Sequence, residues 1–126
     1  MTATLLLIED DAQIRKFLRI SLKANGFEVV ECRLAADGIA ECADRHPDLV
    51  ILDLGLPDAD GKAVIARLRE WTEVPIIVLS VRSDDAEKVA ALDAGANDYV
   101  TKPFSIVELM ARVRALLRRR ESAFRA

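Results

Sequence analysis

The sequence predicts an α/β fold in which a parallel sheet of five strands is doubly wound with five helices. Three short apolar runs, at residues 4–8, 49–54 and 75–80, are continuous instead of alternating. Such runs are typical of strands that are covered on both faces. Segments with helical spacing lie between them, and this regular alternation with short connections indicates parallel strands with helices on both faces.

Weaker strand signals and two amphipathic stripes complete the alternation. Residues 27–31 (FEVVE) and 98–101 (DYVT) are two further strand candidates. Apolar residues recur at helical spacing over residues 14–22, with basic residues on the opposite side, and again over residues 106–117. The chain is therefore predicted to contain five successive strand–helix units.

Turn-forming residues fall between these segments. Asn25-Gly26 is expected to end the first helix and Gly95 the fourth, while His46-Pro47 precedes the third strand. No internal linker, repeat or low-complexity stretch interrupts the pattern. We therefore expect one domain.

The composition agrees with one globular domain. The chain has 126 residues, of which 52% are hydrophobic, 31% charged and only 5% aromatic, so the core must be aliphatic. A net charge of -3 gives no general reason to expect nucleic-acid binding. Cys32 and Cys42 are expected to be reduced thiols. The N-terminus has neither a basic region nor a long apolar run, which predicts no signal peptide or membrane span and favours a cytoplasmic protein.

Polar residues stand where the predicted strands end. In doubly wound sheets the ligand site lies beyond the carboxyl ends of the strands. Acids, a hydroxyl and a lysine converge on that edge although they are scattered along the chain: Glu9, Asp10, Asp11, Asp53, Ser80 and Lys102.

These residue types predict a particular chemistry. Carboxylates without a neighbouring Cys or His form a hard oxygen site suited to Mg²⁺. Lys102 supplies a positive charge for a second acid or a phosphoryl oxygen, and Ser80 can donate a hydrogen bond to an added anion. Asp53 is then equipped to accept a phosphoryl group as an acyl phosphate.

Four motifs carry a family resemblance. IEDD (8–11), LDLGLPDADG (52–61), VLSVRS (78–83) and GANDYVTKPF (95–104) together resemble the receiver domain of two-component response regulators. The resemblance covers residues 5–119 and implies the flavodoxin-like strand order 2-1-3-4-5. LDLGLPDADG, with LREWTEVPIIVLSVRSDD, is most similar to the Kdp potassium-transport regulators of the winged-helix transcription-factor subfamily.

The resemblance implies a role for each site residue. Asp53 is the phosphoacceptor, taking phosphate from a sensor histidine kinase. Asp10 and Asp53 bind Mg²⁺ directly, Glu9 binds it through water, and Gly55 binds it through its backbone carbonyl. These roles make the chain a regulatory domain and not an enzyme.

The same resemblance implies a switch. Lys102 contacts Asp53 at rest and the phosphoryl group after transfer, and the Lys102-Pro103 peptide is cis. Ser80 moves toward the phosphoryl group, which lets Tyr99 rotate inward. Val81 stands where Ala or Gly is usual, so we expect it to narrow access to Asp53.

The resemblance also implies partners. Regulators of this subclass form homodimers through the fourth helix, fifth strand and fifth helix, and Asn97 replaces a more usual acid there. Residues 1–120 are the expected receiver domain, and 121–126 the start of a linker to a C-terminal winged-helix domain that would bind DNA near potassium-transport genes. The expected dimer residues are Lys88, Asp93, Asp98, Glu108, Arg112 and Arg119.

Competing interpretations remain open at this point. Asp53 and the GLPDADG segment could form only a turn, residues 9–11 could cap the first helix, and Lys102 could be a solvated charge. Gly55 to Lys62 nearly matches a phosphate-binding P-loop, but the glycine spacing is wrong and Ala63 follows the lysine. The basic run within residues 112–120 is explained by the solvated face of the last helix.

Two other function classes use a similar sheet. An aspartate-nucleophile phosphohydrolase needs a second acid two residues after the nucleophile, where this chain has Gly55. A flavin-binding domain needs a phosphate loop after Ile8, where three acids stand.

Overall fold

A single parallel sheet organises the molecule. The structure is a computed structural model that describes residues 2–125, with side chains described as far as residue 121. The sheet has the order β2-β1-β3-β4-β5, and every pair is parallel. The predicted fold class and strand order are therefore confirmed. The strands are β1 (Thr4–Ile8), β2 (Glu28–Cys32), β3 (Leu49–Asp53), β4 (Ile76–Ser80) and β5 (Asp98–Thr101).

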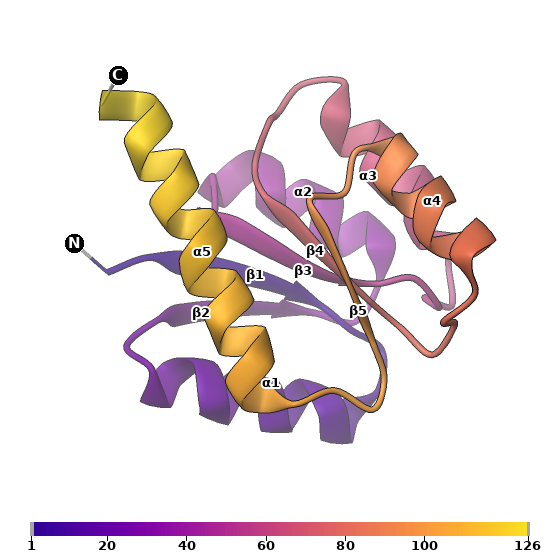
Figure 1. The fold of residues 1–126 in the computed structure, drawn as a ribbon, viewed down its shortest axis with the longest axis horizontal. Coiled ribbons are helices and arrows are strands. Elements are labelled where there is room, and N and C mark those ends of the chain that lie inside the picture. Colours follow the sequence, from indigo (N-terminus) through magenta and orange to yellow (C-terminus); the bar gives the residue numbers. More distant parts are fainter. Residues whose placement is uncertain (1, 126) are drawn as a thin grey trace.

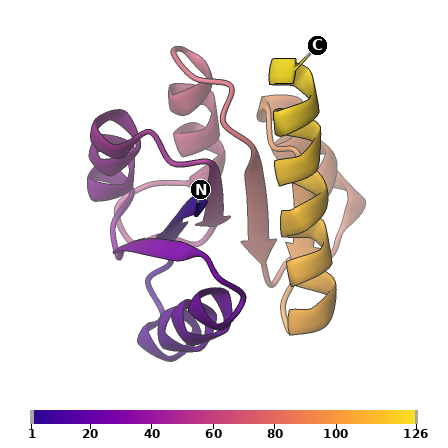
Figure 2. The ribbon, with the colours of Figure 1, turned by 90° about the vertical axis from the view of Figure 1, so that its left-hand side faces the viewer.

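Five helices cover the two faces of this sheet. α1 and α5 lie on one face, and α2, α3 and α4 lie on the other (Figure 1). Turning the view by 90° shows α5 running against the strand direction, so its C-terminal end lies where the strands begin (Figure 2). The helices are α1 (Ala12–Ala24), α2 (Ala35–Arg45), α3 (Gly61–Arg69), α4 (Asp85–Ala94) and α5 (Ile106–Arg125).

The central strands are buried throughout, as their continuous apolar runs predicted. All five residues of β3 and all five of β4 are buried. Their side chains alternate between two aliphatic clusters: Val50 and Leu52 pack under α2 and α3, whereas Leu49 and Ile51 pack under α1 and α5. A core of this kind holds the carboxyl ends of the strands in fixed positions.

Local signals fix several helix ends. Asp11 caps α1, since its Oδ1 accepts hydrogen bonds from the amides of Gln13 and Ile14 at 2.9 and 3.0 Å. Asn25 and Gly95 are the C-caps of α1 and α4, as predicted. Gly95 has φ +122°, a conformation that L side chains rarely adopt.

The last helix continues further than the sequence suggested. The backbone of α5 is helical through Arg125, whereas residues 121–126 were expected to start a linker. Residues 121–125 contain no glycine or proline that would end the helix. The domain boundary at residue 120 stays a prediction. In the part of the chain that the structure describes, no helix combines the length and apolar character needed to cross a bilayer.

The N-terminus of α2 is capped from a distant loop. Its own N-cap residue, Leu34, makes no side-chain cap bond. Instead, the two carboxylate oxygens of Asp58 accept from the amides of Ala35 and Ala36 at 2.8 and 3.1 Å. These bonds lower the pKa of Asp58 below its usual value. The loop that follows Asp53 is thereby fastened to α2.

Replacing Asp58 with alanine is expected to lower stability and to loosen the start of α2, because two helix amides lose their acceptors. Amide hydrogen exchange at Ala35 and Ala36 should accelerate. Since the folded pKa is depressed, the cap stabilises the fold above the ordinary carboxyl pKa and is lost as pH falls through the folded value. Asp44→Ala, an exposed change on the same helix, is the control. Unchanged exchange at both amides would refute the capping role.

Candidate functional site

One lysine joins two acids at the carboxyl edge of the sheet. Lys102 Nζ lies 2.8 Å from Glu9 Oε1 and 3.2 Å from Asp53 Oδ1. The three residues come from the ends of β1, β3 and β5, which the parallel topology brings to the same edge. A turn alone does not account for Asp53, because its charge is paired across the sheet edge with a residue 49 positions away.

Burial makes it costly for the side chains of this cluster to carry charge. Glu9 is 0% exposed, Asp53 8% and Ser80 4%. Burial raises the pKa of Glu9 to about 6; its bond to Lys102 opposes this shift, and the neighbouring Asp53 adds to it. Burial by itself lowers the pKa of Lys102, but the bonds to Glu9 and Asp53 outweigh it and the net shift is upward. One ammonium thus balances two acids.

The set of metal ligands stays a prediction. Asp10, one of its members, is half-exposed, and its Oδ1 lies 3.5 Å from Arg33 Nη1. Within the described residues, no three His, Cys, Asp or Glu side chains are grouped closely enough to hold a metal ion. The donor chemistry nevertheless fits Mg²⁺: two buried carboxylates share one lysine, and an additional cation would offset the repulsion that helps raise the pKa of Glu9.

A cavity of about 430 Å³ opens onto Asp53. Of the predicted site residues, it holds Asp53, Gly55, Ser80 and Lys102. The negative charges of its three acidic side chains balance the positive charges of its three basic side chains. An added phosphoryl group would therefore make the cavity strongly negative. The remaining lining residues are Leu54, Asp60, Lys62, Val81, Arg82 and Glu87.

Val81 lies at the rim of this cavity. The residue is 75% exposed, although it lines the same space as Asp53. The expected narrowing of access stays a prediction. The Lys102-Pro103 peptide bond is cis, the isomer that the family resemblance implied.

Arg82 connects the two residues expected to act as a switch. Its amide donates to Ser80 Oγ at 3.1 Å, and its carbonyl accepts from the Tyr99 hydroxyl at 2.6 Å. The Tyr99 ring packs against the cluster beneath α2, α3 and α4. Arg82 was not among the predicted site residues, and its position two residues after Ser80 was the one available signal.

Four of the six expected dimer residues already interact or lie close together in one chain. Arg112 pairs with Asp98 at 3.0 Å and with Glu108 at 2.8 Å. Lys88 lines the same small cavity as Glu108 and Arg112. Asp93 is exposed on α4. Any contact between two copies that uses Arg112 must therefore compete with its internal pairs.

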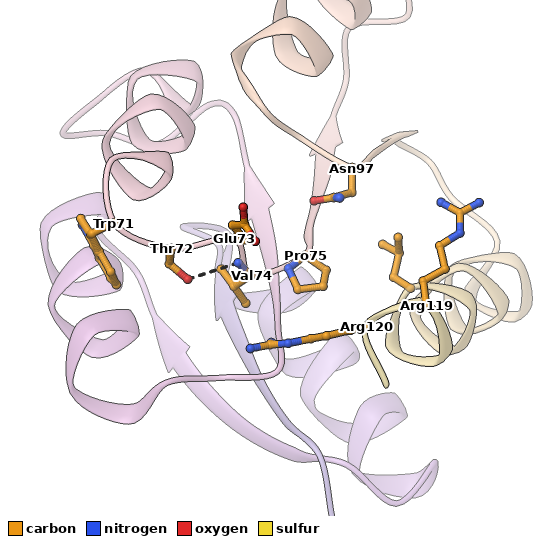
Figure 3. Close-up of a pocket in the computed structure, with 9 residues that line it drawn as sticks. Trp71, Thr72, Glu73, Val74, Pro75, Asn97, Arg119 and Arg120 are labelled. Atoms are coloured by element: carbon orange, nitrogen blue, oxygen red, sulfur yellow. Dashed lines mark hydrogen bonds between the residues drawn. The ribbon is translucent and has the colours of Figure 1, made fainter. Parts of the chain in front are cut away.

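Arg119 lies at the opposite end of the sheet. It lines a cavity of about 470 Å³ beside the α3–β4 connection (Figure 3). Arg120 extends across this cavity below Pro75 and donates to the carbonyls of Pro47 and Asp48, whereas Arg119 points another way (Figure 3). Arg119 is thus apart from Lys88, Glu108 and Arg112.

Asn97 has a structural role near that end. Its Oδ1 accepts from the Ile76 amide and from Arg69 Nη2, both at 2.9 Å. Arg69 also donates to the carbonyls of Thr72, Val74 and Gly95. The amide that replaces a more usual acid therefore helps to join α3, β4 and the start of β5.

Comparison with known proteins decides the family. A profile of the response regulator receiver domain matches residues 5–114. The chain belongs to this family. In this receiver domain, Glu9, Asp53 and Lys102 meet at the carboxyl edge of the sheet.

Relatives of this receiver domain include regulators of the Kdp type. It is 55% identical over 114 residues to the KDP operon transcriptional regulatory protein KdpE of Escherichia coli, covering 90% of this chain and 51% of that protein. It is 50% identical over 118 residues to the transcriptional regulatory protein KdpE of Mycobacterium tuberculosis, covering 94% of this chain and 52% of that protein. The chain thus spans about half the length of these relatives.

Solved structures agree with this assignment. The BeF3-activated receiver domain of Klebsiella pneumoniae RstA matches with TM-score 0.88 and 30% identity, covering 91% of this chain and 98% of that one. A CheY-like receiver domain protein of Methanospirillum hungatei, at 23% identity and TM-score 0.92, covers 98% of this chain and 99% of that one, and shares the fold. The family profile and the KdpE relatives are response regulators, which gives the phosphohydrolase alternative no support.

Proposed function

We propose that this receiver domain accepts a phosphoryl group on Asp53 from a sensor histidine kinase and acts as a regulatory switch. The observation that carries the proposal is the buried Glu9–Lys102–Asp53 cluster at the wall of an open cavity. Asp53 presents a carboxylate to the cavity, Lys102 offsets its charge, and Ser80 stands beside it with a hydroxyl that can donate.

Each residue of the site has its own part in the transfer of the phosphoryl group to Asp53. An Asp53 oxygen attacks phosphorus as the bond from phosphorus to the donor breaks, and the electron pair of that bond leaves with the donor. Lys102 Nζ shifts its contact from the carboxylate to a phosphoryl oxygen, and Ser80 donates to another. Mg²⁺, held by Asp53, Asp10 and the Gly55 carbonyl, with Glu9 through water, would neutralise the oxygens of the transferring group.

Intact mass measurement after incubation with acetyl phosphate tests this function. We expect one phosphate per chain in the presence of Mg²⁺, little after chelation, and none in Asp53→Asn. Asp60→Asn is the matched control, since it changes another acid of the cavity while asparagine can still cap α3. Continuous turnover of a phosphate ester, or phosphate on Asp53→Asn, would favour a hydrolase or a different acceptor.

The proposed output is a homodimer through α4, β5 and α5. Arg112, Asp98 and Glu108 supply both charge signs there, and Val89 and Leu92 are exposed apolar residues on α4. Sedimentation is expected to show a dimer with a phosphoryl mimic, and Arg112→Ala should weaken it. Glu41→Gln, on α2, is the control. A wild-type chain that stays monomeric with the mimic at high concentration contradicts this interface.

The wider role rests on the relatives. Their names describe transcriptional regulatory proteins, and this chain covers about half of the length of each. We propose that this domain controls transcription of potassium-transport genes in the cytoplasm, with DNA bound by a further domain that residues 1–126 do not contain.

A further inference from the structure

An ion pair links α3 to α4 at the wall of the phosphoacceptor cavity. Lys62 Nζ lies 2.9 Å from Glu87 Oε1. Lys62 is in the first turn of α3, and its amide is capped by Asp60. Glu87 is in the first turn of α4, and its amide is capped by Asp84. Both ends of the pair are therefore held by well-defined helix starts.

Both partners line the same cavity as Asp53 and Ser80. The helix that carries Lys62 begins after the loop that follows β3, and the helix that carries Glu87 begins after the segment that follows β4. The cavity lies beyond the ends of these same two strands. A pair that joins the two helix starts consequently closes one side of the space above Asp53.

The pair is more protected than a freely solvated surface pair. The Glu87 side chain is 16% exposed and the Lys62 side chain 31%. The hydrogen bond to Glu87 raises the pKa of Lys62, so the ammonium stays charged. Asp60 Oδ2, at 3.7 Å, adds a second acid on the same side. Partly buried pairs of this kind are screened by solvent and salt less than fully exposed ones.

We infer that the Lys62–Glu87 pair is a cover that slows passage of phosphodonor and water to Asp53, and so sets the lifetime of the phosphoryl group. The inference rests on the proposed function. Lys62 and Glu87 are positioning residues, since their effect on the reaction comes from closing one side of the cavity. While the Lys62–Glu87 pair is intact, phosphorylation of Asp53 and loss of its phosphoryl group are both slow.

The step that the cover slows is hydrolysis of the acyl phosphate. A water oxygen attacks phosphorus, the bond from phosphorus to the Asp53 oxygen breaks, and the electron pair of that bond returns to the carboxylate. Both protons of the water leave with the phosphate that is released. The covering pair takes no part in this exchange of bonds, but it limits how often water reaches the phosphorus.

The test compares Lys62→Met, Glu87→Gln and the double variant. Each chain is loaded with acetyl phosphate and Mg²⁺, the donor is removed, and phosphorylated mass is followed with time. Both single variants should load faster and lose phosphate roughly two- to fivefold faster than wild type. The double variant should lose phosphate about as fast as the singles, because the same contact is already broken.

If Lys62 and Glu87 acted only through the charge that they give the cavity, the variants would behave differently. Lys62→Met makes the cavity more negative and Glu87→Gln makes it more positive, so a purely electrostatic influence moves the rates in opposite directions. The double variant would then behave like wild type, because the net charge is restored. Opposite shifts, a wild-type double variant, or unchanged lifetimes would each overturn the inference.

Variants of an ion pair outside the cavity are the controls for the phosphate lifetime. Glu41→Gln and Arg45→Met break a 2.7 Å pair on α2, away from the cavity, and should leave the lifetime unchanged. If they shorten it equally, the effect is not specific to the cover and the inference fails. A wild-type chain that takes up no phosphate contradicts the proposed function itself, whereas normal loading with equal lifetimes contradicts only the cover.

Discussion

Replacing Lys102 with methionine is expected to destabilise the domain by about 3–5 kcal/mol at neutral pH, the usual cost of removing one partner from a buried ion pair. Glu9 and Asp53 would face each other without the ammonium that lies 2.8 and 3.2 Å from them. Methionine keeps the length and apolar stem of lysine, so packing changes little. The loss therefore reports the charge.

The pH dependence of this loss has a definite sign. The pKa of Glu9 is raised to about 6, so the folded state holds its proton more tightly than the unfolded chain does. Stability from this group is fully present below its ordinary pKa and is lost as pH rises through about 6. Without Lys102 the pKa rises further, and the loss extends to higher pH. The variant should be weakest in alkaline solution.

Urea unfolding of wild type and Lys102→Met at about pH 5 and about pH 8 measures the effect. The deficit should be smaller at the lower pH, where Glu9 is protonated. Adding Glu9→Gln to Lys102→Met should recover part of the stability, and Lys102→Arg, which keeps the charge, is the control. An equal deficit at both pH values would show that packing, not the unpaired acids, causes the loss.

Alanine at position 61 is expected to destabilise the domain by about 1–3 kcal/mol, the range for overpacking a tight site. A Cβ there would lie 2.6 Å from the Leu54 Cα and 3.2 Å from the Asp53 carbonyl oxygen. The neighbour is backbone at the exit of β3, so relief requires moving the segment that carries Asp53. Alanine favours helices more than glycine does, but that gain is smaller than the clash.

Gly55→Ala is the matched control for this change. A Cβ at position 55 meets only Asp53 Oδ2, at 3.9 Å, which is ordinary contact. Thermal and urea unfolding should therefore show a large loss for Gly61→Ala and a small change for Gly55→Ala. Acetyl phosphate loading should slow in Gly61→Ala, because Asp53 is displaced. Equal stabilities for the two variants would rule out the close approach of α3 to β3.

Much of the fold follows from local pattern. The predicted strands at 4–8 and 98–101 have the observed bounds, those at 49–54 and 75–80 differ by one residue at one end, and that at 27–31 is shifted by one residue. Continuous apolar runs identify buried parallel strands whatever their partners are. The cap on α2 could not be predicted in this way, because Asp58 lies 23 residues from Ala35 and only the folded chain brings them together.

The sequence also predicts which residues meet at the site. Parallel topology places the ends of β1, β3 and β5 together, so the meeting of Glu9, Asp53 and Lys102 follows from sequence position. Side-chain directions do not follow from it. The pairing of Asp10 with Arg33 and of Lys62 with Glu87 depends on rotamers and on where neighbouring helices begin.

The link through Arg82 is made of backbone atoms. An amide hydrogen bonds Ser80, and a carbonyl oxygen of the same residue holds Tyr99. In the proposed switch, a pull on the Ser80 hydroxyl therefore reaches Tyr99 as a displacement of the main chain. This route does not depend on which side chain stands at position 82. The Arg82 guanidinium is paired with Asp84 Oδ1 at 3.2 Å and takes no part in this route.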